Sequence, residues 1–230
     1  MGDGGRHKDR FNLNTPRDRA RAWLYAMFQE HNFTNLFRFN FHRIADGVFR
    51  SSQPTMWQLR RVVKKHGIRT ILNLKGANPN SAYWAFEQEQ CEKLGIALID
   101  IDIRSREAPW PEDLRRAKTL FTSIAYPVWM HCKAGADRTG IYATLFQHFH
   151  QRMPIEHTNQ LKLWPFGHFR LSKAGRIDNY LEHYLTYRRT HPEIDLLEWA
   201  EQIADRDRID REFRPFALAS FINDSLLRRE

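Results

Sequence analysis

The sequence predicts an α/β fold with a mainly parallel central sheet flanked by helices, and with extra helices at both ends of the chain. Short apolar runs of strand length, such as residues 68–74 and 127–130, alternate with longer segments of helical periodicity. This alternation is typical of parallel sheets, because each parallel strand needs a long crossover before the next one. Ligands bind such sheets at the carboxyl ends of the strands, so residues that directly follow a strand are the first candidates for a functional site.

Capping residues and glycines mark the ends of the predicted elements in the first half of the chain. Thr15 is a suitable N-cap and Pro16 a suitable first residue of a helix, whereas Gly67 and Gly95 are suitable helix ends. We therefore expect two short strands at 44–50, a helix at 56–66, a strand at 68–74, a helix at 81–94, a strand at 96–103 and a helix from Pro111.

The second half of the chain is mainly helical in its periodicity. A helix is expected from about 141 to 152, followed by a break at Pro154 and a second helix over 155–163. Residues 164–170 are an aromatic connector, to which we assign a packing role. Further helical patterns cover 177–185, 196–203 and 213–227.

The first predicted helix is basic and amphipathic. Trp23, Leu24, Met27 and Phe28 fall at helical spacing, while three arginines crowd the first turns. We expect the apolar face to pack on the domain; the alternative is that it lies on a membrane surface.

Length and composition bound the architecture. The 230 residues suit one sizeable domain with additions, and a hydrophobic fraction of 42% fits a globular protein. No apolar run reaches the length of a membrane span, and the N-terminus lacks the apolar core of a signal peptide. The two cysteines, Cys91 and Cys132, are too few for a disulfide framework, so we expect a reducing, cytoplasmic location.

The net charge of +9 predicts an anionic substrate or partner. No zinc-finger, RNP-type or helix-turn-helix signature occurs, so nucleic acid is not the expected partner. A basic surface around a phosphate site explains the charge more simply, and it would also suit a substrate with several phosphates or an anionic membrane face.

One stretch, residues 131–140, carries the chemistry. It follows a predicted buried strand and precedes a predicted helix, and Cys132 and Arg138 lie six positions apart with small residues between them. The N–H groups of such a loop and the positive end of the helix can surround a tetrahedral anion, and Arg138 can bind two of its oxygens. In that positive field Cys132 is predicted to act as a thiolate nucleophile.

This stretch resembles the Cys-x5-Arg loop of the cysteine-dependent tyrosine and dual-specificity phosphatases. The matching residues are His131, Cys132, Gly135, Arg138 and Thr139. The run 48–54 is also similar to the opening of small atypical dual-specificity phosphatases. Rhodanese-type sulfurtransferases also present a cysteine in an anion-binding loop, but theirs is usually shorter.

The resemblance implies a fold, a division of the chain and a mechanism. We expect a dual-specificity-phosphatase-like catalytic domain at 44–190, a flexible tail at 1–13, and helical extensions at 14–43 and 191–230. Cys132 would form a phosphocysteine, Thr139 would stabilise the departing thiolate, and no metal or cofactor would be needed. The residues expected to bind the phosphate are Lys133, Ala134, Gly135, Ala136, Asp137 and Arg138.

The general acid is ambiguous in the sequence. The family usually places an aspartate about thirty residues before the cysteine, which favours Asp102, with Asp100 and Glu107 nearby. Related bacterial loops end in Lys-Asp-Arg and are thought to use the aspartate of the loop, here Asp137, although this chain has Ala136 in place of the lysine. The segment 110–113 imitates a Trp-Pro-Asp loop, but it also reads as an ordinary helix start. We rank Asp102 first and Asp137 second.

Several functions stay open at this point. The first is an active phosphatase whose substrate is a phosphoprotein or another small phosphomonoester. An alternative substrate is a phosphoinositide, another phospholipid or an inositol phosphate, because Cys-Lys-Ala-Gly, with Lys133 as its lysine, occurs in phosphatases that act on such substrates. The other two are an inactive adaptor that binds a phosphorylated partner, and a basic membrane- or nucleic-acid-binding protein.

Overall fold

The computed structural model describes residues 11–104 and 107–216. Five strands form one sheet in the order β1-β2-β5-β3-β4, and only β1 runs antiparallel to its neighbour. The strands are β1 (His42–Ala45), β2 (Val48–Ser52), β3 (Thr70–Asn73), β4 (Ala97–Asp100) and β5 (Val128–Cys132). The predicted α/β class with a mainly parallel sheet is confirmed.

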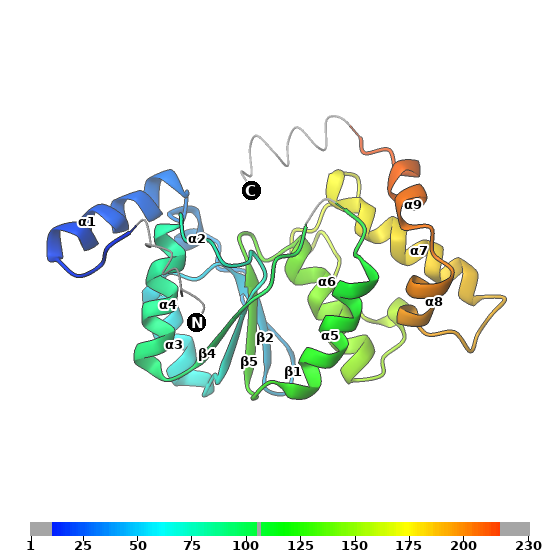
Figure 1. Cartoon of the computed structure of the whole chain (residues 1–230), viewed down its shortest axis with the longest axis horizontal. Helices are drawn as coiled ribbons and strands as arrows, with labels where there is room; N and C mark the ends of the chain where they lie inside the picture. The colour runs from blue at the N-terminus through cyan, green and yellow to red at the C-terminus, as the bar shows by residue number, and fades with distance from the viewer. Residues whose placement is uncertain (1–10, 105–106, 217–230) are drawn as a thin grey trace, which may run out of the picture.

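Helices cover both faces of the sheet, as Figure 1 shows. On one face lie α3 (Met56–His66) and α4 (Ala82–Leu94), and on the other α5 (Pro111–Ser123) and α6 (Asp137–Leu145). The outer helices α7 (Arg176–Arg188), α8 (Leu196–Gln202) and α9 (Arg206–Glu212) pack outside α5 and α6. At the opposite end of the molecule, α1 (Pro16–Leu24), a π-helical turn (Tyr25–Gln29) and α2 (Thr34–Phe37) pack near α4.

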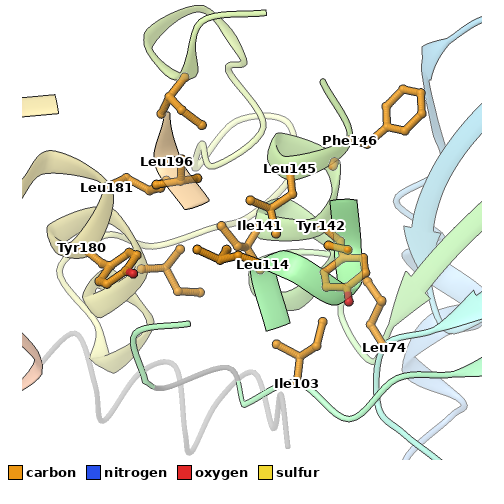
Figure 2. Packing of buried hydrophobic residues seen from close by; sticks show 14 of the residues in the cluster. Leu74, Ile103, Leu114, Ile141, Tyr142, Leu145, Phe146, Tyr180, Leu181 and Leu196 are labelled. Carbon is orange, nitrogen blue, oxygen red and sulfur yellow. The ribbon is translucent and has the colours of Figure 1, made fainter. Parts of the chain in front are cut away.

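The alternation of side chains along the strands divides the core in two. In β5, Val128 and Met130 face α5 and α6, whereas Trp129 faces α3 and α4. The larger core joins the sheet to α5, α6 and α7, and Figure 2 shows part of it, with Ile141 and Leu145 packed beside Leu114 and Leu181. Because β5 is central and buried along its whole length, its carboxyl end is held firmly.

The predicted caps determine where several helices begin and end. Thr15 accepts a hydrogen bond from the N–H of Asp18 at the start of α1, and Thr55 forms a capping box with Gln58 at the start of α3. Gly67 ends α3 in the left-handed conformation that this position favours.

Three helices expected from the sequence differ in the structure or extend beyond the described residues. Residues 155–163 contain only a 3-10 turn, Ile155–His157, and Asn159 just after it takes a left-handed φ of +51°, which interrupts a right-handed helix. The helix after the loop ends at His150, its last turn being the π-helical Phe146–His150. Of the helix expected at 213–227, residues 213–216 are not helical and the remainder lies outside the described residues.

The expectation that the large apolar residues of the first helix pack on the domain was wrong. Trp23, Leu24 and Phe28 are 52%, 51% and 59% exposed. The buried residues of this segment are Ala22 and Ala26, which pack near α4. The periodicity was correct, but the small residues, rather than the large ones, face the protein. Among the described residues, no helix combines the length and apolar character needed to cross a bilayer.

Candidate active site

The stretch singled out in the sequence forms the connection between β5 and α6. Cys132 is the last residue of the central strand and is 5% exposed, while Asp137 is the first residue of α6. The strand therefore fixes the sulfur, and the helix directs its positive end at the space above it. The structure brings together all the predicted phosphate-binding residues, because they are consecutive in this short loop.

The carbonyl groups of the loop point outward. Gln53 N–H donates to the carbonyl oxygen of Lys133 at 3.1 Å, and Asn40 Nδ2 donates to those of Ala134 and Gly135 at 3.0 and 3.2 Å. Arg50 donates to the oxygens of Gly135 and Ala136 at 2.8 and 3.3 Å. Since the N–H of a trans peptide points opposite to its C=O, the N–H groups of residues 134–137 are directed into the loop. Four such donors and a helix N-terminus make a receptor for a tetrahedral oxyanion.

Arg50 lies directly beneath the loop and was not predicted from the sequence. Its guanidinium is fully buried, stacks at 3.9 Å from the centre of the Phe166 ring, and also donates to Gln160. Burial lowers the pKa of Arg50 to about 10, although the nearby Cys132 and Asp137 favour its charge. Nη2 donates to both loop carbonyls while Nη1 donates to Gln160, so the guanidinium holds the loop in shape in a way that a lysine could not.

Gly135 permits the close approach of the loop to β2. Its φ is +69°, and a Cβ atom at this position would lie 2.5 Å from the carbonyl carbon of Ser51 and from the nitrogen of Ser52. Real Cβ atoms essentially never come this close to backbone, so only glycine fits.

The other residues of the loop take positions that suit phosphate chemistry. Arg138 is the second residue of α6, and both it and Lys133 are half-buried. Thr139 is fully buried, and its hydroxyl has no hydrogen-bond partner within the part of the chain that the structure describes. A buried hydroxyl without a partner is costly, which is consistent with a role that begins only when a reactant is present.

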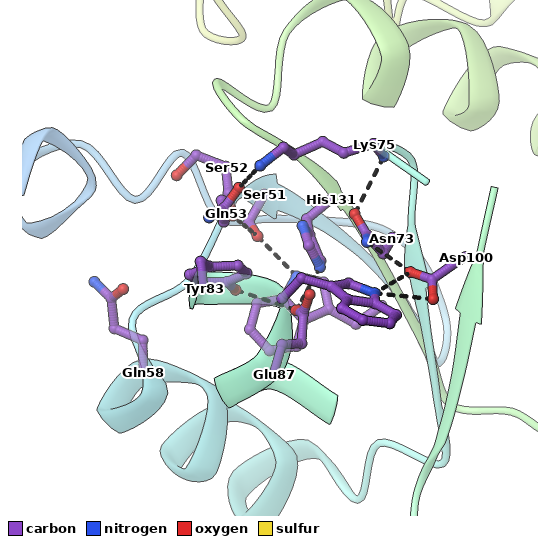
Figure 3. Close-up of polar contacts among 12 residues, drawn as sticks. Ser51, Ser52, Gln53, Gln58, Asn73, Lys75, Tyr83, Glu87, Asp100 and His131 are labelled. Carbon is purple, nitrogen blue, oxygen red and sulfur yellow. Dashed lines mark hydrogen bonds and ion pairs between the residues drawn. The ribbon is translucent and has the colours of Figure 1, made fainter. Parts of the chain in front are cut away.

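A buried polar network supports the end of β5 from the side of α4, as Figure 3 shows. His131 Nε2 lies 2.8 Å from Glu87 Oε1, and both side chains are completely buried. The hydroxyl of Tyr83 donates to the same carboxylate at 3.1 Å. Burial, together with this carboxylate, raises the pKa of Tyr83, so it stays a donor. His131 and Glu87 therefore hold the end of the strand that carries Cys132 in place.

Lys75 adds a further positive charge that the sequence did not point out. Its Nζ donates to Gln53 Oε1 at 2.7 Å, the residue whose N–H binds the loop (Figure 3). Burial lowers the pKa of Lys75 to about 8, Glu30 and Glu87 oppose this, and Lys133 and Arg138 add to it. Because the charges of Lys133 and Arg138 lower the pKa of Lys75, its ammonium group adds to the positive charge around the loop.

The candidate acids have very different surroundings. Asp102 is exposed, its backbone is paired with Lys75, and its carboxylate has no hydrogen bond or ion pair among the described residues. Asp100 instead accepts hydrogen bonds from Asn73 and from the indole N–H of Trp84. Glu107 pairs with Arg104 and Arg206, so neither it nor Asp100 is free to meet a substrate.

The segment 110–113 is a helix start, as the sequence indicated. Pro111 is the first residue of α5, and Asp113 accepts a hydrogen bond from the N–H of Trp110 at 3.4 Å. The Asp113 carboxylate therefore caps α5. The segment 110–113 looks like a Trp-Pro-Asp loop because it is a helix start, and we assign it no catalytic role.

Asp137 belongs to a second buried network, which includes His168 of the aromatic connector. His168, 1% exposed, lies 2.7 Å by its Nδ1 from Asp137 Oδ1 and 2.6 Å by its Nε2 from Asp178 Oδ2. Burial lowers the pKa of His168, but the hydrogen bonds to both carboxylates outweigh burial and raise the pKa to about 9. His168 is therefore an imidazolium at neutral pH that ties the loop to α7.

This network predicts a pH dependence of stability. The ordinary pKa of His168 is 6.5 and its pKa in the fold is about 9. Protonation of His168 therefore stabilises the fold fully below pH 6.5, and this stabilisation is lost as the pH rises through 9. We expect the free energy of unfolding of the wild type to fall by about 3 kcal/mol relative to His168→Gln across this range. Urea unfolding of both proteins at pH 6 to 10 measures this difference. If the difference in free energy of unfolding between the two proteins did not change with pH, the prediction would be contradicted.

The two cysteines differ sharply in their surroundings. Cys91 is buried in the core beside α3, and burial raises the pKa of its thiol, as do Glu87 and Asp100. Cys132 instead stands at the base of the ring of N–H donors. Of the two, only Cys132 is placed to act as a nucleophile. Within the described ranges, no group of three or more His, Cys, Asp or Glu side chains could hold a metal ion.

The chain was compared with known families and solved structures. A family model described as "DSP-PTPase phosphatase fused to NAD+ Kinase" matches residues 41–174. No match was found among curated proteins. The fold is similar to that of P. aeruginosa TpbA in complex with pTyr, with 14% identity, a TM-score of 0.48, and coverage of 75% of this chain and 89% of that chain.

Two further solved structures show a similar arrangement. Tk-PTP in its active form is 15% identical, with a TM-score of 0.45 and coverage of 76% of this chain and 98% of that chain. PTPMT1 in complex with PI(5)P is 16% identical, with a TM-score of 0.44 and coverage of 52% of this chain and 78% of that chain.

Proposed function

Because the chain belongs to the DSP-PTPase phosphatases, in the family described as fused to NAD+ kinase, we propose that it is a metal-independent phosphomonoester hydrolase that acts through a phosphocysteine. One observation carries the proposal: the carbonyls of four consecutive loop residues are bound from outside, which directs a ring of N–H groups toward the space above Cys132. This arrangement suits the three equatorial oxygens of a phosphoryl group in transfer.

The reaction consists of two displacements at phosphorus. In the first, the thiolate of Cys132 attacks, an S–P bond forms, and the ester P–O bond breaks as the leaving oxygen takes a proton from the general acid. In the second, water attacks the phosphocysteine, loses a proton to the same carboxylate, and the S–P bond breaks. The unpaired hydroxyl of Thr139 donates to the departing thiolate in this step.

We assign the general acid to Asp102 and a positioning role to Asp137. A general acid must hand its proton to an oxygen at the mouth of the site and then exchange it with water. The Asp102 carboxylate is exposed and unengaged within the described chain, whereas Asp137 is buried and bound by His168. Arg138 and the loop N–H groups stabilise the transferring phosphoryl group, and removing one such donor typically costs about 10²–10³ in rate.

The substrate is a phosphorylated protein or small molecule, or, alternatively, a phosphoinositide or other lipid or inositol phosphate. Lys133 belongs to the loop and Lys75 donates to Gln53, whose N–H binds the loop, so two further positive charges favour a substrate with charge beyond one phosphate. The intact Cys132, Arg138 and Thr139 argue against an inactive adaptor. We further propose a cytoplasmic location, since both cysteines are free thiols and a thiolate enzyme needs a reducing compartment.

The test is hydrolysis of a chromogenic aryl phosphate by the full chain without added metal. We expect turnover that vanadate inhibits and that is lost in Cys132→Ser, with Cys91→Ser as the matched control that keeps it. A panel of phosphotyrosine, phosphoserine, phosphoinositide and inositol phosphate then ranks the substrate classes. Phosphate binding without turnover by the wild type would favour the adaptor.

A further inference from the structure

Large apolar side chains gather on the exposed surface of the N-terminal helical segment and the start of α3. They define an N-terminal apolar surface formed by Trp23, Leu24, Phe28, Leu36, Phe37 and Trp57, each at least half exposed. Three of them, Trp23, Leu36 and Trp57, line one cavity, and exposed apolar groups of this kind commonly mark a binding surface. Figure 1 shows that α1 projects from one end of the molecule.

The orientation of the segment explains why these residues are exposed. Ala22 and Ala26 pack against the core group that includes Tyr83 and Phe86 of α4. Because the small residues of the helix occupy the protein side, the large ones must face away from it. A helix that only completed the core would bury its aromatic side chains instead.

A cavity of about 610 Å³ opens within this surface, between the N-terminal segment and helices α3 and α4. Trp23, Trp57 and Phe86 line it, together with Asn32. The Asn32 side chain is 4% exposed, and its Oδ1 accepts a hydrogen bond from Gln53 Nε2 at 2.9 Å. Its Nδ2 has no acceptor among the described residues. A buried donor left without an acceptor is costly, so this amide points to a ligand that supplies an oxygen.

The charge around the surface is positive. Residues 16–38, 56–65 and 82–94, which surround the cavity, contain nine Lys and Arg residues and five acidic ones, Asp18, Glu30, Glu87, Glu89 and Glu92. Glu30 is occupied by the N–H groups of Ala82 and Tyr83, and Asp18 by Thr15. The cavity itself is lined by Arg19, which is paired with Glu89 of α4, and by Arg60, which donates to Gln90. An occupant with both apolar and anionic parts therefore complements this surface.

We propose that the N-terminal apolar surface docks the protein on an anionic lipid bilayer and that the cavity accepts one lipid. Aromatic side chains beside arginines are the composition of helices that lie in the plane of a membrane interface. The aromatic residues enter the headgroup layer, the arginines bind lipid phosphates, and Asn32 Nδ2 donates to an oxygen of the bound lipid. This goes beyond the proposed phosphatase and does not depend on it.

Vesicle sedimentation of the full chain tests the proposal. We expect binding to vesicles of phosphatidylcholine mixed with phosphatidylglycerol and much weaker binding to phosphatidylcholine alone. The pair Trp23→Ser and Phe28→Ser should weaken binding about tenfold or more. The matched pair Leu163→Ser and Trp164→Ser removes two apolar side chains elsewhere that are at least as exposed, at 61% and 85%, and should leave binding unchanged.

Arginine variants provide a second, independent measurement. Arg17→Gln and Arg21→Gln alter exposed side chains of α1 and should each weaken binding about fivefold at low salt, an effect that added salt removes. This pair keeps the proposal testable if the apolar pair does not fold. Cys132→Ser should bind vesicles like the wild type, which separates docking from catalysis.

Several outcomes would overturn the proposal. They are equal binding to both kinds of vesicle, an equal loss in the Leu163 and Trp164 control, and no binding at all. A concentration-dependent dimer that disappears in the Trp23 and Phe28 variant would identify a second copy of the chain as the occupant instead.

Discussion

Replacing Gly135 with alanine is expected to abolish phosphatase activity and to lower the free energy of unfolding by at least about 2–3 kcal/mol. The new Cβ would lie 2.5 Å from the backbone of Ser51 and Ser52, so either the loop or β2 must move. Moving the loop breaks the hydrogen bonds from Arg50 to the carbonyls of Gly135 and Ala136, and the inward N–H groups lose their direction. Initial rates with an aryl phosphate and urea unfolding measure the two effects.

Gly95→Ala is the matched control for this variant. Gly95 has a similar φ of +64°, but a Cβ there meets nothing within 4 Å. It should therefore show only the cost of the left-handed conformation, about 1 kcal/mol, with full activity. If Gly135→Ala were as active and as stable as Gly95→Ala, the inference that the close approach of the loop to β2 requires glycine would be wrong.

Asp102→Asn is expected to reduce kcat by about 10²–10⁴ with substrates whose leaving group needs a proton, such as phosphotyrosine. With an aryl phosphate that has an acidic leaving group, the loss should be much smaller, because that oxygen departs without protonation. Asp137→Asn should show no such dependence on the leaving group. Its effect should be on stability, because it removes one of the two carboxylates that bind His168.

Kinetics of the two variants over a series of aryl phosphates decides between these roles. A leaving-group dependence confined to Asp137→Asn would transfer the role of general acid from Asp102 to the loop. Equal turnover of both variants and the wild type with every substrate would exclude both carboxylates.

The sequence predicted the sheet, most helices and the loop, because each depends on residues close together in the chain. Apolar runs marked β3 and β5, and Gly67 and Gly95 marked helix ends. The loop was recognisable from the spacing of Cys132 and Arg138. Signals of this kind lie within a short stretch of sequence, so they can be recognised without knowledge of tertiary contacts.

The residues that the sequence did not reveal act through contacts between distant segments. Arg50 reaches Gly135 across 85 positions, and His168 reaches Asp137 across 31. The one signal given above was the resemblance of the run 48–54, which includes Arg50 but does not identify the residues that it contacts. The orientation of α1 was also unpredictable, because periodicity gives the spacing of a face but not what the face meets.

Direct detection of a covalent intermediate tests the central claim most directly. The full chain is mixed with an aryl phosphate, quenched in acid within the first turnovers, digested and analysed by mass spectrometry. We predict a phosphoryl group on the peptide that contains Cys132, absent from the peptide that contains Cys91 and from the Cys132→Ser protein. Steady turnover of substrate without any phosphoryl group on Cys132 would contradict the mechanism proposed for this loop.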